Sequence, residues 1–161
     1  MALLILVAQY EKGSDEERER ICKTYLANTR FINNWDLVDL SAHKIVGPHC
    51  KNKDKDFLYR LSQSKNLWER RISMVATWHF IRQGRFTEAL RISKSLLRDA
   101  HDLIHKSVGW MLREVGKKDT QTLEKFLDRY RARMARTTLR YAIERFPEKQ
   151  RKAYLQSGRR A

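Results

Sequence analysis

The chain is organised around Ile32-Asn33-Asn34-Trp35-Asp36-Leu37-Val38-Asp39-Leu40, a stretch that places a tryptophan and a carboxylate four residues apart. We expect a helix here, because Asn33 can cap it and Asp36 meets the free backbone N–H groups of its first turn. Apolar residues then recur at helical spacing, at Val38, Ala42 and Ile45.

Asp39 is predicted to lie beside the apolar stripe of this helix. Four residues make about one helical turn, so Trp35 and Asp39 share a face. A carboxylate on that flank needs a partner, because burying a lone charge is costly. Two roles remain open for Asp39: a structural ion pair with a cation such as Arg71, or a carboxylate held ready for a cationic ligand or transition state.

The composition favours a single all-α domain. A chain of 161 residues with 42% hydrophobic residues is long enough for one core, which we assign to residues 1–157, followed by a basic tail, 158–161. Two prolines and six glycines are few for a β-sandwich. Cys22 and Cys50 form no C-x-x-C motif, which argues against a disulfide framework or a zinc site and favours a reducing compartment.

The chain is strongly basic, with a formal net charge of +15. Residues 117–161 carry 14 Lys and Arg against 5 Asp and Glu. Such a balance attracts nucleic acid or another anionic surface, although solvated basic faces are the common alternative. The apolar start, residues 2–8, is too short to span a bilayer, so we expect a packed helix and a cytoplasmic protein.

Helix signals recur along the whole chain. Longer predicted helices begin near residues 33, 66, 102 and 136, each with a shorter helix before it. This period is typical of a helical-hairpin solenoid, here expected as a right-handed superhelical stack with a basic concave face, while a compact bundle stays open. We expect helix caps at Ser14, Asn33, Thr87 and Asp119 or Thr120, and helix stops at Gly13, Gly47-Pro48, Gly84 and Gly116.

Several residues do not fit the pattern expected of a hydrophobic core. Trp110 lies away from the apolar stripe of its predicted helix, near Lys106 and Arg113. An indole among cations suits a nucleic-acid groove, and packing against a neighbouring helix is the alternative. On the predicted helix 66–83, Trp78 and Arg82 lie beside the core stripe together with Arg71. His101 and His105 are interpreted as surface histidines, because no glutamate completes a zinc-hydrolase pattern.

Three motifs give the chain a specific resemblance. They are Asn34-Trp35-Asp36-Leu37-Val38-Asp39, Leu67-Trp68-Glu69-Arg70-Arg71 and Lys106-Ser107-Val108-Gly109-Trp110-Met111-Leu112-Arg113-Glu114. Over essentially its whole length the chain resembles the DNA alkylation repair family of AlkD-type alkylpurine DNA glycosylases. The resemblance implies HEAT-like repeats curved around duplex DNA and removal of cationic N3- or N7-alkylated purines, such as 3-methyladenine and 7-methylguanine, without base flipping.

The resemblance also assigns residue roles. Trp35 and Trp110 would be aromatic walls at the lesion, Asp39 the catalytic carboxylate and Arg71 the cation that holds the backbone nearby. Arg71 is expected to contact DNA together with Arg82, Lys106 and Arg113. The reaction would be simple hydrolysis without strand cleavage, with no cofactor and no metal, on double-stranded DNA that carries alkylated bases.

One departure from the family pattern concerns the N-terminus. Members usually have about two more helices before the segment that matches Met1, so we expect the apolar N-terminal helix to lack a neighbour. Three alternatives stay open: a fragment, a naturally short relative, or a chain that self-associates through this helix. Two other functions stay open beside the glycosylase: a non-catalytic nucleic-acid-binding repeat, which predicts salt-sensitive binding without base release, and a protein-binding scaffold.

Overall fold

The computed structural model describes residues 2–50 and 55–156, and within these ranges every regular element is a helix. The all-α prediction is therefore confirmed. The helices are α1 (Ala2–Lys12), α2 (Asp15–Ala27), α3 (Trp35–His49), α4 (Asp56–Ser62), α5 (Leu67–Ala76), α6 (Trp78–Ile81), α7 (Thr87–Leu96), α8 (Asp102–Lys118), α9 (Thr120–Tyr130), α10 (Arg136–Ala142) and α11 (Glu148–Gln156), with short 3₁₀ turns at Thr29–Phe31 and Arg131–Arg133.

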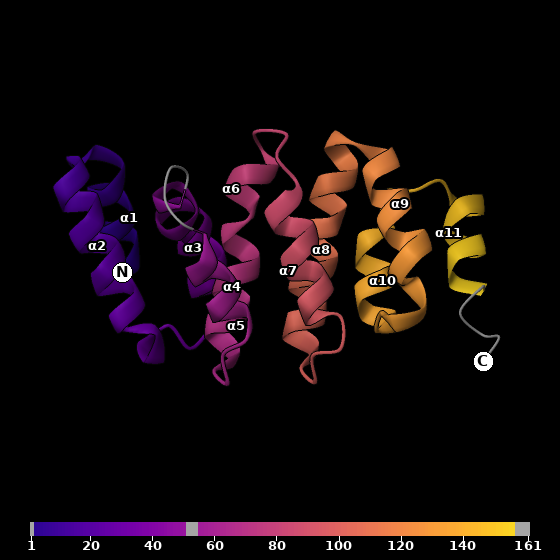
Figure 1. The fold of residues 1–161 in the computed structure, drawn as a ribbon, viewed down its shortest axis with the longest axis horizontal. Coiled ribbons are helices and arrows are strands. Elements are labelled where there is room, and N and C mark those ends of the chain that lie inside the picture. Colours follow the sequence, from indigo (N-terminus) through magenta and orange to yellow (C-terminus); the bar gives the residue numbers. More distant parts are fainter. Residues whose placement is uncertain (1, 51–54, 157–161) are drawn as a thin grey trace.

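The helices follow one another along the long axis of the molecule, with the two ends of the chain at opposite ends (Figure 1). Long-range contacts join α3 to α5, α5 to α8 and α8 to α10, and we call these four helices the back row. Figure 1 shows α7 in front of α8 and α9 in front of α10, while α4 packs against both α5 and α7. We call α4, α7 and α9 the front row.

One hydrophobic core runs through the stack, from Val7 near the N-terminal end to Tyr154 in α11. The core side of α3 is formed by Val38, Ala42 and Ile45, as the spacing predicted, and all three are fully buried. The single domain over residues 1–157 stays a prediction. The predicted basic tail, 158–161, lies outside the described residues.

Two of the four predicted caps match the observed ones. Ser14 and Glu17 form the predicted capping box, with Ser14 N donating to Glu17 Oε2 at 2.7 Å and Glu17 N donating to Ser14 Oγ at 3.3 Å. The cap of α9 is Asp119, which accepts from the backbone N–H of Thr122. Each bond satisfies a donor that the first turn would otherwise leave free.

Two predicted caps are wrong. The residue before α3 is Asn34 rather than Asn33, and its side chain makes no capping bond. Asp36 Oδ1 instead accepts from the backbone N–H of Leu37 at 2.8 Å, so a carboxylate within the first turn takes over part of the role of the cap. Thr87 is already the first residue of α7 and does not cap it.

The predicted stop at Gly47-Pro48 is also wrong, because α3 continues through both residues to its end one residue later. Gly47 serves a close helix contact instead. A Cβ atom there would lie 2.5 Å from His79 Cβ and 2.6 Å from the carbonyl oxygen of Ala76. The absence of a side chain therefore lets α3 approach the α5–α6 segment.

Gly116 is a second glycine that packs rather than ends a helix. It lies inside α8, where a Cβ atom would meet Leu123 Cδ2 of α9 at 2.4 Å. Gly84 does follow the end of a helix, with φ of +72°, a conformation that favours glycine. The predicted helix 66–83 is divided at Thr77 into α5 and α6.

The N-terminal helix leaves part of its apolar side uncovered. Val7 and Tyr10 are buried, whereas Leu4 and Ile5 are 54% and 53% exposed. Self-association through this side stays a prediction. Within the described ranges, the helices lack the combination of length and apolar character that a membrane crossing requires.

The contact at Gly47 predicts a specific stability effect. Gly47→Ala should lower the free energy of unfolding by about 1–3 kcal/mol, because overpacking against the Ala76 carbonyl outweighs the better helix propensity of alanine. Urea denaturation followed by circular dichroism measures this. Gln9→Ala, at an exposed position of α1, should stay within about 0.5 kcal/mol of the wild type, and an equally stable Gly47→Ala variant would contradict the packing argument.

Candidate functional site

A bidentate ion pair between Asp39 and Arg71 connects three helices of the back row. Arg71 Nε donates to Asp39 Oδ1 at 3.0 Å and Arg71 Nη2 donates to Asp39 Oδ2 at 2.8 Å. The remaining terminal nitrogen, Nη1, donates to the backbone carbonyl of Leu103 in α8. The structure thus brings two predicted site residues into direct contact, and one guanidinium joins α3, α5 and α8.

The pair lies mostly out of solvent. Arg71 is 5% exposed, and the Asp39 side chain retains 17% of its exposure. Burial raises the pKa of Asp39, while the hydrogen bonds and the positive charge of Arg71 act in the opposite direction. The site therefore holds a carboxylate whose ionisation costs more than in water and which keeps a small opening to solvent.

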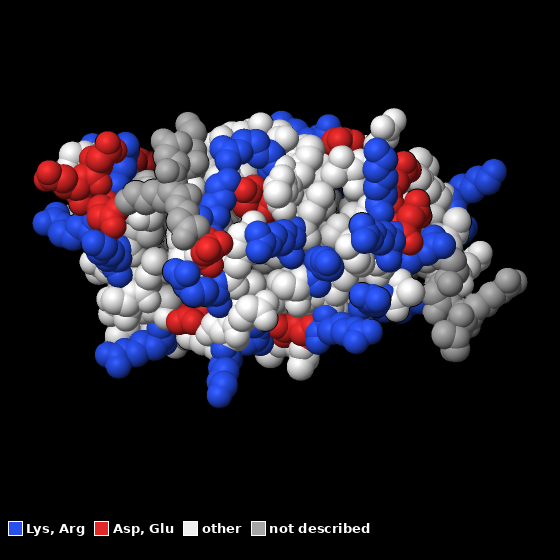
Figure 2. Space-filling view, viewed as in Figure 1, with Lys and Arg blue, Asp and Glu red and all other residues white. Residues whose placement is uncertain are grey.

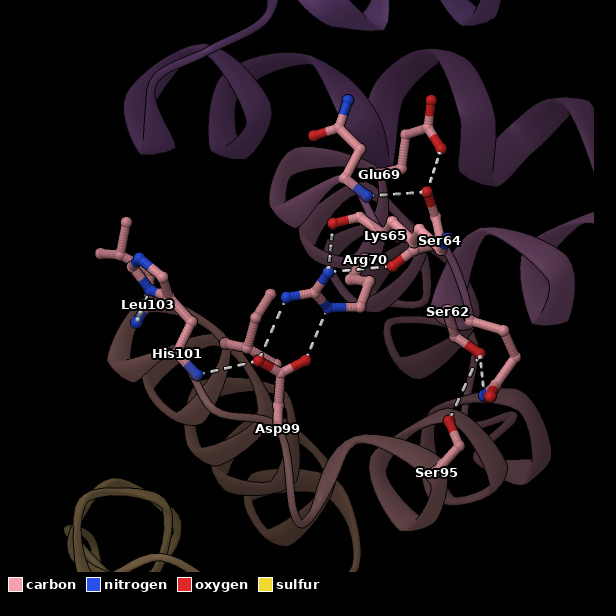
Figure 3. Close-up of polar contacts among 12 residues, drawn as sticks. Ser62, Ser64, Lys65, Glu69, Arg70, Ser95, Asp99, His101 and Leu103 are labelled. Carbon is pink, nitrogen blue, oxygen red and sulfur yellow. Dashed lines mark hydrogen bonds and ion pairs between the residues drawn. The ribbon is translucent and has the colours of Figure 1, made fainter.

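A second ion pair next to the first fixes the start of α5 (Figure 3). Arg70 Nε donates to Asp99 Oδ2 at 2.6 Å, and Arg70 Nη1 donates to the backbone carbonyls of Ser64 and Lys65 at 2.9 and 3.0 Å. Asp99 lies between α7 and α8. Because Arg70 precedes Arg71 directly, this network fixes the backbone that carries the guanidinium of the site.

The same network positions the backbone carbonyl of Leu103, which accepts a hydrogen bond from Arg71. Asp99 Oδ1 accepts from the backbone N–H of His101, and His101 Nδ1 accepts from the backbone N–H of Leu103 at 3.2 Å (Figure 3). His101 is thus an exposed cap of α8, and His105 Nε2 lies 2.6 Å from the carbonyl oxygen of Asp99. Within the described ranges, no group of three or more His, Cys, Asp and Glu side chains is placed to hold a metal ion.

A row of rings continues from the ion pair across the back row. His43 lies one turn beyond Asp39 on α3 and packs on Trp78, with ring centroids 4.6 Å apart. Trp78 in turn meets the edge of Trp110, with centroids 5.1 Å apart. The guanidinium of Arg82 lies 5.3 Å from the Trp78 ring. Trp110 is half-buried in this row, so its contact with a neighbouring helix, the alternative interpretation, is realised.

His43 is the functional candidate that sequence reasoning missed. It is 5% exposed, and burial followed by the charges of Arg82 and Lys44 lowers its pKa to about 4, so the ring is neutral at pH 7. Together with His79 it also lines a hollow beside the ring row. The spacing of four residues that linked Trp35 to Asp39 extends directly to His43 and would have found it.

The other predicted site residues differ in solvent exposure and in ion pairing. Trp35 is 53% exposed at the start of α3. Lys106 pairs with Asp102 at 2.8 Å, and Arg113 pairs with Glu114 at 3.7 Å and also contacts Glu144. Arg82 is exposed above its ring. Their contact with DNA stays a prediction, as does the shared placement of Trp35 and Trp110 at one lesion.

A family model described as DNA alkylation repair enzyme matches residues 1–146. The chain belongs to this family. Comparisons with curated proteins and with solved structures found no match. Membership of the DNA alkylation repair family supports a role in DNA repair, DNA as the partner and an enzymatic activity.

The buried pair gives this family member a testable pH dependence. In Arg71→Met the Asp39 carboxylate loses its cation, which should cost about 3–5 kcal/mol of stability at pH 7. Because burial keeps the folded pKa of Asp39 above its unfolded value, the folded state binds more protons between the two values. The stability of this variant should therefore be greatest below the unfolded pKa and fall as pH rises through the folded pKa.

Urea unfolding between about pH 4 and pH 8 measures this effect. The control is the double variant Arg71→Met with Asp39→Asn, which contains neither charge. It should be more stable than Arg71→Met alone at pH 7 and should lack the additional loss as pH rises. Identical pH profiles for the two variants would show that Asp39 is not the titrating group.

Proposed function

We propose that the protein is a DNA glycosylase that hydrolyses the N-glycosidic bond of cationic N3- or N7-alkylated purines in duplex DNA. The observation that carries the proposal is the Asp39 carboxylate, which Arg71 holds in a bidentate pair with a small opening to solvent. Family membership supports a role in DNA repair, and a buried carboxylate of this kind fits the chemistry of base excision.

The chemistry needs few groups. An alkylated purine already carries positive charge, so its departure requires no protonation by the enzyme. The sugar develops oxocarbenium-like charge as the bond breaks, and a nearby carboxylate stabilises that charge and orients water. Because burial makes ionisation of Asp39 costly, its charge interacts more strongly with an approaching cation than a fully hydrated carboxylate would. Water is the nucleophile, so the DNA strand stays intact.

Arg71 is best assigned as a positioning residue. Its guanidinium already serves both oxygens of Asp39 and the Leu103 carbonyl, and the residue is 5% exposed. We therefore propose that it orients the carboxylate and aligns three helices, rather than serving as a main phosphate contact. Among the predicted DNA contacts, Arg82 is exposed, whereas Lys106 and Arg113 must exchange carboxylate partners for phosphate.

The helix rows support the architecture that such a function needs. We infer that the pairs α4–α5, α7–α8 and α9–α10 are HEAT-like repeats of a right-handed solenoid, with the back row as the concave, DNA-facing side. Trp35 and Tyr141, at 53% and 36% exposure, are the aromatic side chains of the back row most open to a duplex. Either ring offers a surface for packing on sugar or base.

Release of 7-methylguanine or 3-methyladenine from methylated duplex DNA tests the proposal. Asp39→Asn should lower the rate of release at least about a hundredfold, because it removes the charge that stabilises the sugar cation. The substitution also leaves Arg71 without its anion, so the assay temperature must lie well below the melting temperature of the variant. Full activity of a folded Asp39→Asn protein would exclude the mechanism.

Binding in the absence of base release would favour the non-catalytic alternative. That outcome requires folded wild-type protein that binds duplex DNA with strong salt dependence and liberates no base above background.

Trp35 offers a second test, because its exposure separates function from stability. Trp35→Ala should weaken duplex binding and base release while changing the free energy of unfolding by less than about 0.5 kcal/mol. Phe31→Ala is the matched control, since Phe31 is 62% exposed in the turn just before α3. Fluorescence anisotropy with a methylated duplex compares the two variants. Equal effects of both would remove Trp35 from the site.

A further inference from the structure

A basic groove lies on the other side of the stack, between α7 and α9 of the front row. Figure 2 shows Lys and Arg side chains over these two helices, with Asp and Glu side chains beside those of α9. We call this surface the α7–α9 groove, and it is lined by Leu90, Arg91, Lys94, Thr122, Lys125, Phe126, Arg129 and Tyr130. Its four cations are exposed, and none of them forms an ion pair with a carboxylate of the described residues.

Aromatic rings support three of these cations. The guanidinium of Arg91 lies 3.8 Å from the ring of Tyr59 in α4. Arg129 and Lys94 lie 5.4 and 6.0 Å from the ring of Tyr130, so one ring is shared by cations from α9 and α7. A cation packed on a ring loses fewer rotamers on binding an anion than a free one. The groove is therefore partly organised before any partner arrives.

A solvated charged face, the common explanation of surface lysines, usually interleaves both signs of charge. The carboxylates of α9 are engaged elsewhere. Glu124 accepts from Gln150 of α11 at 2.6 Å, and Asp128 accepts from Tyr154 of α11 at 3.5 Å. Like charges three or four residues apart destabilise a helix. Because the four cations form no ion pair within the described residues, an external anion can pair with them without displacing a carboxylate.

The groove is separate from the candidate catalytic site. Asp39 and Arg71 belong to α3 and α5 of the back row, whereas α7 and α9 lie in front of α8 and α10 (Figure 1). An anion held in the groove therefore leaves the catalytic carboxylate free.

We propose that the α7–α9 groove binds the phosphate backbone of a second DNA segment while the back row holds the first. The proposal depends on DNA as the partner but not on base release. Cations from two adjacent helices present several charges along one track, which matches the repeated charge of a nucleic-acid backbone. Two DNA contacts on opposite rows would let the protein pass between segments while it searches for lesions.

The test is a bridging assay with unmodified duplexes. One duplex is biotinylated and captured on beads, and a second, fluorescent duplex is recovered only when the protein holds both. Wild-type protein should recover the second duplex. The groove variant should recover at least fivefold less, and it carries four substitutions to glutamine: Arg91→Gln, Lys94→Gln, Lys125→Gln and Arg129→Gln.

A matched control loses the same charge at exposed positions elsewhere: Lys12→Gln, Arg20→Gln, Arg30→Gln and Lys149→Gln. It should bridge as wild type does. Equal losses in the two variants would overturn the proposal, because net charge alone would then explain bridging. Bridging that survives in the folded groove variant would also overturn it and would favour a self-associated protein with one duplex on each copy.

A variant with only two substitutions separates loss of DNA binding from loss of folding. Lys94→Gln with Lys125→Gln leaves both arginines on their rings, and it should still reduce bridging at least twofold. For the four-residue variant, the slope of log K against log salt for the second duplex should be smaller by about 3, as expected for lost phosphate contacts. Loss of binding to anionic phospholipid vesicles with unchanged duplex bridging would overturn the proposal in favour of a membrane surface.

Discussion

The buried pair of Asp39 and Arg71 is the constraint on which the back row depends. Two opposite charges that leave water must satisfy each other closely, and the pair does so with two hydrogen bonds and a third to the Leu103 carbonyl. Both connections span 32 residues of sequence. A single guanidinium therefore fixes the spacing of α3, α5 and α8, and any shift of one helix would leave a charge unpaired.

Polar contacts between residues at a similar separation in sequence recur along the stack. Arg70 joins Asp99 across 29 residues, and Lys55 joins Glu88 across 33. Such bonds connect neighbouring helical pairs at about the same separation in sequence. The apolar core supplies most of the favourable free energy of folding. The repeated step explains how three separate sequence motifs come to lie on neighbouring helices.

The electrostatic pattern divides the molecule into two faces with different properties. In the back row, a buried carboxylate and a neutral His43 lie beside a row of rings, and several cations there already have acidic partners. In the front row, the four exposed cations of the α7–α9 groove form no ion pair with a carboxylate of the described residues. A strongly basic chain thus keeps one carboxylate in a buried ion pair on one face, while exposed cations on the other face attract polyanions.

The sequence by itself determined the helical class, the capping box at Ser14, the core side of α3 and the family, because these depend on local bonding and on periodicity. The sequence left the pairing of Asp39 with Arg71 as one of two alternatives, because this contact depends on how α3 packs against α5. Tertiary structure alone decided that Gly47 and Gly116 are packing residues, that Trp110 packs on Trp78, and that each nitrogen of the Arg71 guanidinium already donates a hydrogen bond. Each of these outcomes depends on which helix lies opposite, and helical spacing carries no information about the neighbour across a contact.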